Sequence, residues 1–184
     1  MSEERGWHAA LDEHDMAVRE LMATCGRIPL DRWHRSPAPG KWSPSGVVLH
    51  LCRAYEVGRE AADGGPGMRL LVSPSRAWAL RTLLLPVILR TQRFPRGVRA
   101  PREVVPLDAT SARSTPDEAL TRLEHVAREA AIALRRAADG RPVPRMMHAY
   151  FGPLGPRAAL RVLSAHTRHH ARALARLTIP ARTD

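Results

Sequence analysis

Three segments of this sequence begin with the same helix-start signal, a serine or threonine followed directly by proline. The pairs are Ser43-Pro44, Ser73-Pro74 and Thr115-Pro116, and apolar residues follow each pair at helical spacing. Serine and threonine cap the first backbone N–H groups of a helix, and proline fits the first helical position because its missing N–H needs no partner there. The third pair also begins a Thr-x-x-Glu capping box. These signals favour an all-α fold.

Proline, glycine and the spacing of apolar residues divide the rest of the chain in the same way. We expect helices over Ser2 to Cys25, Ser43 to about Asp63, Ser73 to about Phe94, Thr115 to about Asp139, and about Arg157 to Leu177. Pro86 should kink or split the third helix. Residues 95–106 and 142–156 are predicted to be connecting segments. No segment alternates polar and apolar residues as a strand does. The prediction is a four-helix up-down-type bundle with long connections and one extra or kinked helical segment.

The length and composition agree with one domain over residues 1–184. Hydrophobic residues make up 44% of the sequence and charged residues 26%, which is typical of a globular chain with a buried core. The N-terminus has no apolar run of the signal-peptide kind. The longest apolar stretch, Leu83 to Leu89, is far shorter than the roughly 20 residues of a membrane span. We therefore expect a soluble cytoplasmic protein without a membrane partner.

The formal net charge of +11 raises the alternative of a nucleic-acid-associated protein. Lys41 is the only lysine, however, and the arginines are spread through almost every segment. This pattern is typical of a GC-rich bacterial genome, so nucleic acid is the weaker alternative. The two cysteines, Cys25 and Cys52, do not make a disulfide framework, and we expect half-buried free thiols in a reducing cytoplasm.

Nine histidines occur, and the last helix carries three of them in His166-Thr167-Arg168-His169-His170. Helical residues four apart differ by about 40° in direction, so His166 and His170 can aim two imidazoles at one point. His170 lies within the apolar stripe of the helix and His166 lies at its edge. His169 is a poorer partner for His166 and falls among arginines, which places it towards solvent.

A third ligand has to come from another helix, and His50 is the best candidate because its neighbours are apolar. The alternative is a core histidine satisfied by hydrogen bonds. Three neutral imidazoles suit Zn, Ni, Fe or Co better than Mg or Ca, and three protein ligands leave positions open for chemistry. The remaining histidines considered are expected at the surface: His8, His14, His34 and His125.

Two of these segments resemble the DinB/YfiT-like superfamily. Gly40 to Leu51 resembles the "kWS…hl" start of the second helix of that superfamily, and His166 to His170 resembles its last-helix H-x-x-H-H signature. The two motifs lie 116 residues apart in the expected order, and the loop from His148 to Gly152 resembles one branch. The resemblance extends from Trp7 to about Leu177.

The resemblance implies a four-helix bundle, usually dimeric, with a divalent metal on His50, His166 and His170. Zn or Ni is expected first, with Fe or Co as alternatives. Similar proteins include thiol S-transferases and a maleylpyruvate isomerase that use low-molecular-weight thiols. One departure concerns the pocket: relatives often carry glutamine shortly after the double histidine, where this chain has Arg172-Ala173.

Three functions stay open at this point. The first is a metal-dependent transferase or hydrolase, with S-transfer from a low-molecular-weight thiol to a small-molecule substrate. The second is a non-catalytic metal-binding or stress-related bundle, and the third is nucleic-acid association. Arg53 and Arg168 could attract an anionic thiol, although solvated helix faces are their commoner role. Glu56 is not assigned as a base, because it lies six residues after His50.

Overall fold

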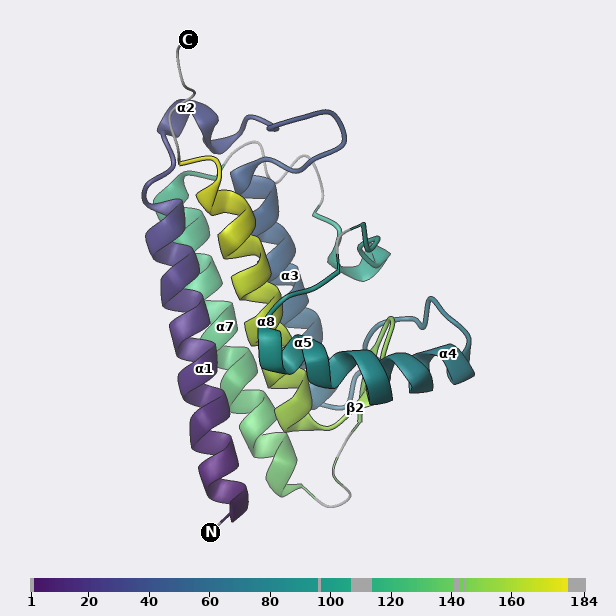
Figure 1. The fold of residues 1–184 in the computed structure, drawn as a ribbon. Helices are drawn as coiled ribbons and strands as arrows, with labels where there is room; N and C mark the ends of the chain where they lie inside the picture. Colours follow the sequence, from purple (N-terminus) through teal and green to yellow (C-terminus); the bar gives the residue numbers. More distant parts are fainter. Residues whose placement is uncertain (1, 96, 107–113, 141–142, 144, 179–184) are drawn as a thin grey trace.

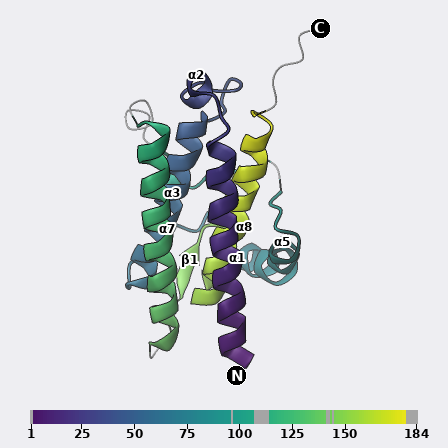
Figure 2. The ribbon, with the colours of Figure 1, turned by 90° about the vertical axis from the view of Figure 1, so that its left-hand side faces the viewer.

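The computed structural model describes residues 2–95, 97–106, 114–140, 143 and 145–178. Four long helices lie side by side in a bundle: α1 (Ser2–Cys25), α3 (Pro44–Ala62), α7 (Pro116–Asp139) and α8 (Pro156–Ala175). Helices α1 and α8 run in one direction, and α3 and α7 run in the other (Figures 1 and 2). A short helix α2 (Leu30–Trp33) crosses one end. The predicted all-α bundle is confirmed.

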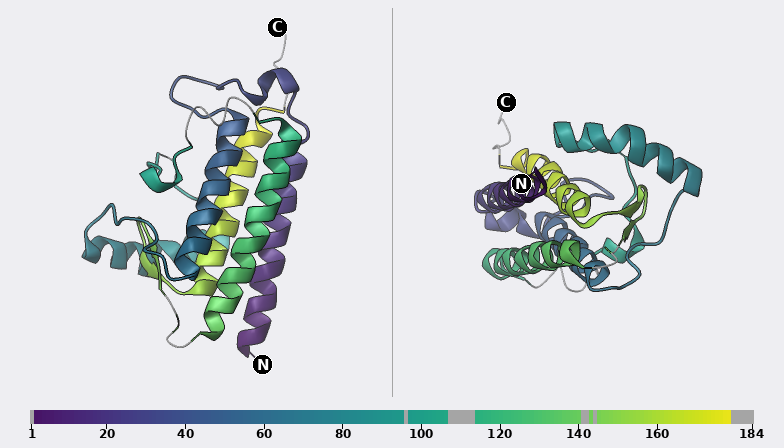
Figure 3. Two further views of the ribbon diagram at one scale, coloured as in Figure 1. Left: turned by 180° about the vertical axis from the view of Figure 1, so that it is seen from behind. Right: turned by 90° about the horizontal axis from the view of Figure 1, so that it is seen from below.

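The long connection between α3 and α7 forms an arm beside the bundle. It contains α4 (Pro74–Ala79), a π-helical stretch η1 (Leu80–Leu84), α5 (Leu85–Thr91) and a 3-10 turn η2 (Arg102–Val104). The first three form a nearly continuous rod that lies across the bundle direction, as the view from below shows (Figure 3). This arm is the extra helical segment that the sequence predicted.

The three predicted helix starts are confirmed in atomic detail. The backbone N–H of Gly46 donates to the Ser43 hydroxyl at 3.2 Å, and the N–H of Arg76 donates to that of Ser73 at 3.3 Å. At the start of α7, the Thr115 hydroxyl accepts from the Glu118 N–H, and the Glu118 carboxylate accepts from the Thr115 N–H. Each cap satisfies a backbone donor that the helix itself leaves free.

Pro86 splits the arm as predicted, and the structure shows how. The backbone N–H of Leu85 donates to Leu80, five residues back, in place of the usual four. Pro86 has no N–H to donate, and its ring leaves no room for the regular bond to the carbonyl four residues earlier. A π-helical stretch therefore precedes the proline, and Gln92 ends α5 in the left-handed conformation with φ of 54°.

The prediction that no segment forms a strand was wrong for residues 146–154. Strands β1 (Met146–His148) and β2 (Gly152–Leu154) pair antiparallel, with His148 opposite Gly152. Three-residue strands are too short to display an alternating pattern, so hydrophobic periodicity could not reveal them. The hairpin instead depends on its turn, after which Gly152 has φ of 67°. It packs against the arm and α3 (Figure 1).

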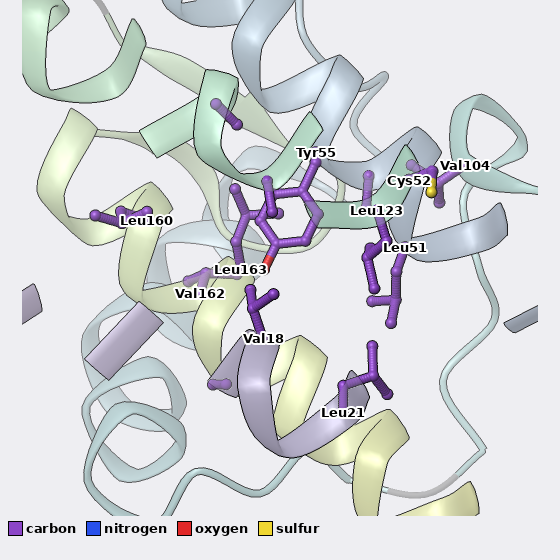
Figure 4. Close-up of a cluster of buried hydrophobic side chains, with 14 of the residues drawn as sticks. Val18, Leu21, Leu51, Cys52, Tyr55, Val104, Leu123, Leu160, Val162 and Leu163 are labelled. Carbon is purple, nitrogen blue, oxygen red and sulfur yellow. The ribbon is translucent and has the colours of Figure 1, made fainter. Parts of the chain in front are cut away.

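The core lies between α1, α3, α7 and α8, and its side chains point towards one another (Figure 4). Tyr55 is completely buried, and its hydroxyl bonds the Thr167 hydroxyl at 2.7 Å, which joins α3 to α8. Cys25 and Cys52 are free, as expected, but fully buried instead of half-buried. Burial raises the pKa of both thiols to about 12, so they stay unreactive.

His14 was expected at the surface, and this prediction was wrong. Its side chain is only 2% exposed and meets the Tyr55 ring edge-on at 5.5 Å. The polar residues beside it in the sequence concealed its place on the inner face of α1, three residues before Ala17 and seven before Leu21. His8, His34 and His125 are exposed, as predicted.

Among the helices in the described ranges, none combines the length and apolar character that a membrane crossing requires.

Candidate metal centre

The structure brings the three predicted histidines together from two helices. Nε2 of His50, on α3, lies 3.1 Å from Nε2 of His166, on α8. Nε2 of His170, one helical turn further along α8, lies 3.0 Å from the same His166 atom. The three residues offer ligand atoms that all lie within 4.8 Å of one another. The i, i+4 spacing on α8 therefore does aim two imidazoles at one point.

One hydrogen bond fixes the orientation of the third ring. Nδ1 of His50 lies 2.7 Å from the carbonyl oxygen of Val104, in the 3-10 turn of the connection. A carbonyl can only accept, so Nδ1 carries the proton and the Nε2 lone pair of the neutral ring points at the other two histidines. A bond of this kind, from the far nitrogen to a carbonyl, is what commonly orients a metal-binding histidine.

If all three rings are neutral, hydrogen bonds cannot account for both short Nε2–Nε2 contacts. Because Nε2 of neutral His50 has no proton, its short contact requires a proton on Nε2 of His166. That proton would leave the same nitrogen without a lone pair, so it could not accept from His170. At most one of the two N···N contacts is then an ordinary hydrogen bond. A cation between the three nitrogens would use all three lone pairs at once.

Burial keeps the rings neutral, which is the form that binds metals. The pKa of His50 is lowered by burial, although the bond to Val104 opposes this shift. Burial also holds the pKa values of His166 and His170 well below the ordinary value, and the neighbouring histidines lower them further. The group could therefore hold a divalent transition metal.

Aromatic side chains enclose the cluster. Trp42, just before the α3 cap, packs on the His50 ring with 4.6 Å between ring centroids. Phe94, just beyond the end of α5, meets His166 at 5.8 Å and His169 at 6.0 Å. His169 is thus half-buried and lines the same space, although the sequence placed it towards solvent.

The histidines form part of the wall of a cleft of about 1350 Å³ between the bundle, the arm, the connection and the hairpin. His148, which ends β1, lines it as well. Its Nδ1 accepts from the backbone N–H groups of Tyr150 and Phe151, at 3.2 and 3.3 Å, and its ring stacks on Phe151. The sequence did not identify His148 as a cleft residue, and its only signal was the resemblance of the surrounding loop to one branch of the family.

The two arginines proposed to attract an anion face other partners. Arg53 pairs with Glu56 and Glu60, and Arg168 pairs with Glu20 on α1. Both arginines therefore form ion pairs with carboxylates on the helix surfaces, and neither lines the cleft. Other cationic side chains, which the sequence did not single out, line the cleft: Lys41, Arg76, Arg93, Arg99, Arg172 and Arg176.

Comparison with known proteins finds one family. The model of the DinB superfamily matches residues 10–174, which includes all three clustered histidines. No curated protein and no solved structure matches the chain significantly.

Proposed function

The chain belongs to the DinB superfamily, and from this premise we propose that it is a metal-dependent enzyme whose metal is held by His50, His166 and His170. The observation that carries the proposal is the convergence of three Nε2 atoms, one of them fixed by the Val104 carbonyl. Imidazole ligands favour Zn or Ni, with Fe or Co as alternatives. Three protein ligands leave at least one position open, as catalytic sites do.

The reaction we propose is S-transfer from a low-molecular-weight thiol to a small-molecule substrate. A bound divalent metal would supply a positive charge that lowers the pKa of a thiol at its open position. Single-ligand pockets usually have volumes of roughly 300–1,000 Å³, and the cleft, at about 1350 Å³, has room for two small molecules. Trp42 and Phe94 limit the access of water to the histidines.

Elemental analysis tests the metal site. Protein purified without chelator or affinity tag should carry about one transition-metal ion per chain. His50→Ala, His166→Ala and His170→Ala should each lose it, because two imidazoles bind far more weakly than three. His169→Ala is the matched control on the same helix and should keep it. Metal-free wild-type protein, or equal loss in the control, contradicts the proposal.

A screen of low-molecular-weight thiols against electrophiles tests the reaction. Turnover should require both thiol and metal, and it should disappear after chelation and return with the metal. Stoichiometric metal without any thiol-dependent turnover would instead favour a non-catalytic metal-binding bundle.

We also propose that the protein is a cytoplasmic homodimer. Trp78, Leu83 and Val87 on the arm are each more than half exposed, and a second copy would remove them from water. Light scattering should give twice the chain mass of 20.4 kDa. Leu83→Glu should give the monomer, whereas a monomeric wild type contradicts this part of the proposal.

A further inference from the structure

The lining of the cleft is cationic. Six lysine and arginine side chains contribute to it, and no aspartate or glutamate of the described ranges does. Within the same ranges, none of the six has a carboxylate partner: Lys41, Arg76, Arg93, Arg99, Arg172 and Arg176. All six residues are exposed, so water and salt weaken their fields, but with no carboxylate among them they present a single sign of charge to a ligand that enters the cleft.

The carboxylates that could neutralise these charges lie elsewhere. Seven arginines outside the cleft pair with aspartate or glutamate within 4.0 Å: Arg53, Arg59, Arg122, Arg135, Arg136, Arg161 and Arg168. Other arginines of the described ranges, such as Arg5 and Arg19 on α1, also lie outside the cleft without a carboxylate within 4.0 Å. What distinguishes the cleft is that its described lining contains six cationic side chains and no acidic one, and that one of them, Arg172, donates to the backbone carbonyl of Gln92.

Two of the six cationic residues, Arg172 and Arg176, follow the histidine cluster closely in the sequence. Burial lowers the pKa of His169, and the guanidinium groups of Arg172 and Arg176 lower it further. Arg172 lies three residues beyond His169 on α8, and Arg176, seven residues beyond His169, is the residue that caps the end of this helix. Both arginines line the same cleft as the three imidazoles, so they could hold one end of a ligand while its other end faces the histidines.

The remaining walls are apolar. Several elements supply them: Trp42 precedes α3, Val162 and Leu163 belong to α8, Leu84 and Ile88 to the arm, and Phe151 to the turn of the hairpin. Such a wall favours a hydrocarbon or aromatic body over a small hydrated ion such as phosphate. The lining thus combines apolar area with cationic groups.

His148 adds one neutral donor to this lining. Its Nδ1 accepts two backbone N–H groups, so a neutral ring must carry its proton on Nε2. Nε2 has no hydrogen-bond partner within the described part of the chain. An oxygen of a ligand can accept from it, and an ammonium group cannot. The donor set of the cleft therefore selects against cationic ligands.

We propose that the cleft binds a small organic anion with an apolar body, whose carboxylate is held by Arg172 and Arg176. The inference rests on the proposed function, since it names the substrate class of the same site. Guanidinium groups suit this role because they donate two parallel hydrogen bonds to a carboxylate. With the carboxylate bound to the two arginines, the open coordination position of the proposed metal stays available for the reacting group.

Calorimetry on zinc-loaded protein tests the inference with three probes of one shape: 4-phenylbutyrate, its neutral amide, and 4-phenylbutylamine. The carboxylate should bind at least about tenfold more tightly than the amide, and the amine should not bind detectably. Undetectable binding of 4-phenylbutyrate, or equal binding of the carboxylate and the amide, overturns the inference.

A pair of double variants locates the charge effect. Arg172→Gln with Arg176→Gln should weaken carboxylate binding about tenfold and leave amide binding and metal content unchanged. Arg5→Gln with Arg19→Gln removes the same charge from exposed positions on α1. This control should leave carboxylate binding, amide binding and metal content unchanged. An equal loss in both double variants would mean that net charge, and not the site, attracts the anion, and this also overturns the inference.

Removal of the metal separates this inference from the proposed function. In chelator-treated wild type and in His50→Ala, the preference for carboxylate over amide should persist, because the arginines provide it. If the preference disappears with the metal, the carboxylate ligates the metal and the inference is wrong, although the metal site stands. If the purified protein has no metal but prefers the carboxylate, the proposed function fails and the anion site stands.

Discussion

His14 and His50 are buried to the same degree, each 2% exposed, but their surroundings give them different roles. His50 has a carbonyl on one side and two imidazoles on the other. His14 has Asp15 on one nitrogen, and its Nε2 is buried with no partner among the described residues. A buried polar atom without a partner lowers stability, and unlike His50, His14 lies outside any candidate site.

His14→Leu should therefore stabilise the protein, by about 1 kcal/mol at pH 7.5, because an apolar side chain of similar size leaves no unpaired polar atom. Burial lowers the pKa of His14 from 6.5. Below pH 6.5 the unfolded chain binds a proton that the folded chain does not, so wild-type stability falls as the pH falls. Urea unfolding at pH 7.5 and 5.5 should show the advantage of the variant growing at the lower pH. The exposed His125→Leu is the control, and a similar pH effect there would contradict this explanation.

His148 gives a second prediction for a single residue. Burial lowers its pKa from 6.5 to about 4, and its Nδ1 accepts two N–H groups. NMR of ¹⁵N-labelled protein should show one neutral tautomer, with the proton on Nε2, that persists down to about pH 5. The signal is assigned by its loss in His148→Gln. A ring that titrates near 6.5 would show that the hairpin does not hold it as the structure indicates.

At the scale of helices and strands, local sequence signals defined most boundaries. The Ser43, Ser73 and Thr115 caps could be predicted because a cap depends on residues within one turn. The β1–β2 hairpin could not, because its pairing depends on a turn and on packing against the arm. The π-helical stretch before Pro86 is intermediate: proline predicts an interruption but does not specify how the hydrogen bonds rearrange.

Thr115→Ala tests the strongest of these caps. It removes the hydroxyl that accepts from the Glu118 N–H, so we expect a loss of about 1 kcal/mol in the free energy of unfolding. Thr121→Ala, an exposed position inside α7, is the matched control and should not destabilise, since alanine is the better helix former there. Urea denaturation of both variants measures the difference. Equal stability of the two would show that the cap contributes little.

The candidate site could be predicted only where its residues lie on one helix. His166 and His170 share one helix, so their spacing alone predicted that they converge. Helical geometry left His50 as a candidate, and the family resemblance assigned it. The cationic lining and His148 were not identified, because they come from separate elements that meet only in the folded chain. Long-range packing determines which elements come into contact, and the spacing of residues within one segment does not reveal it.

At the scale of the whole molecule, the candidate centre joins segments far apart in the sequence. His50 belongs to α3, His166 and His170 belong to α8, and Val104 in the connection supports His50. None of these groups is held together in an unfolded chain, so metal binding to the folded state adds directly to the stability of the bundle.

Metal removal should therefore lower the melting temperature of the whole protein. Zinc at about 100 times its dissociation constant contributes about 2.7 kcal/mol. For a chain of this length, each kcal/mol raises Tm by about 2–4 °C, so a rise of about 5–10 °C is expected. Scanning calorimetry of chelator-treated protein with and without added zinc measures it. His50→Ala should show little of this shift and His169→Ala should show all of it, because only the first removes a nitrogen of the cluster. A full shift in His50→Ala would place the stabilising metal elsewhere on the chain.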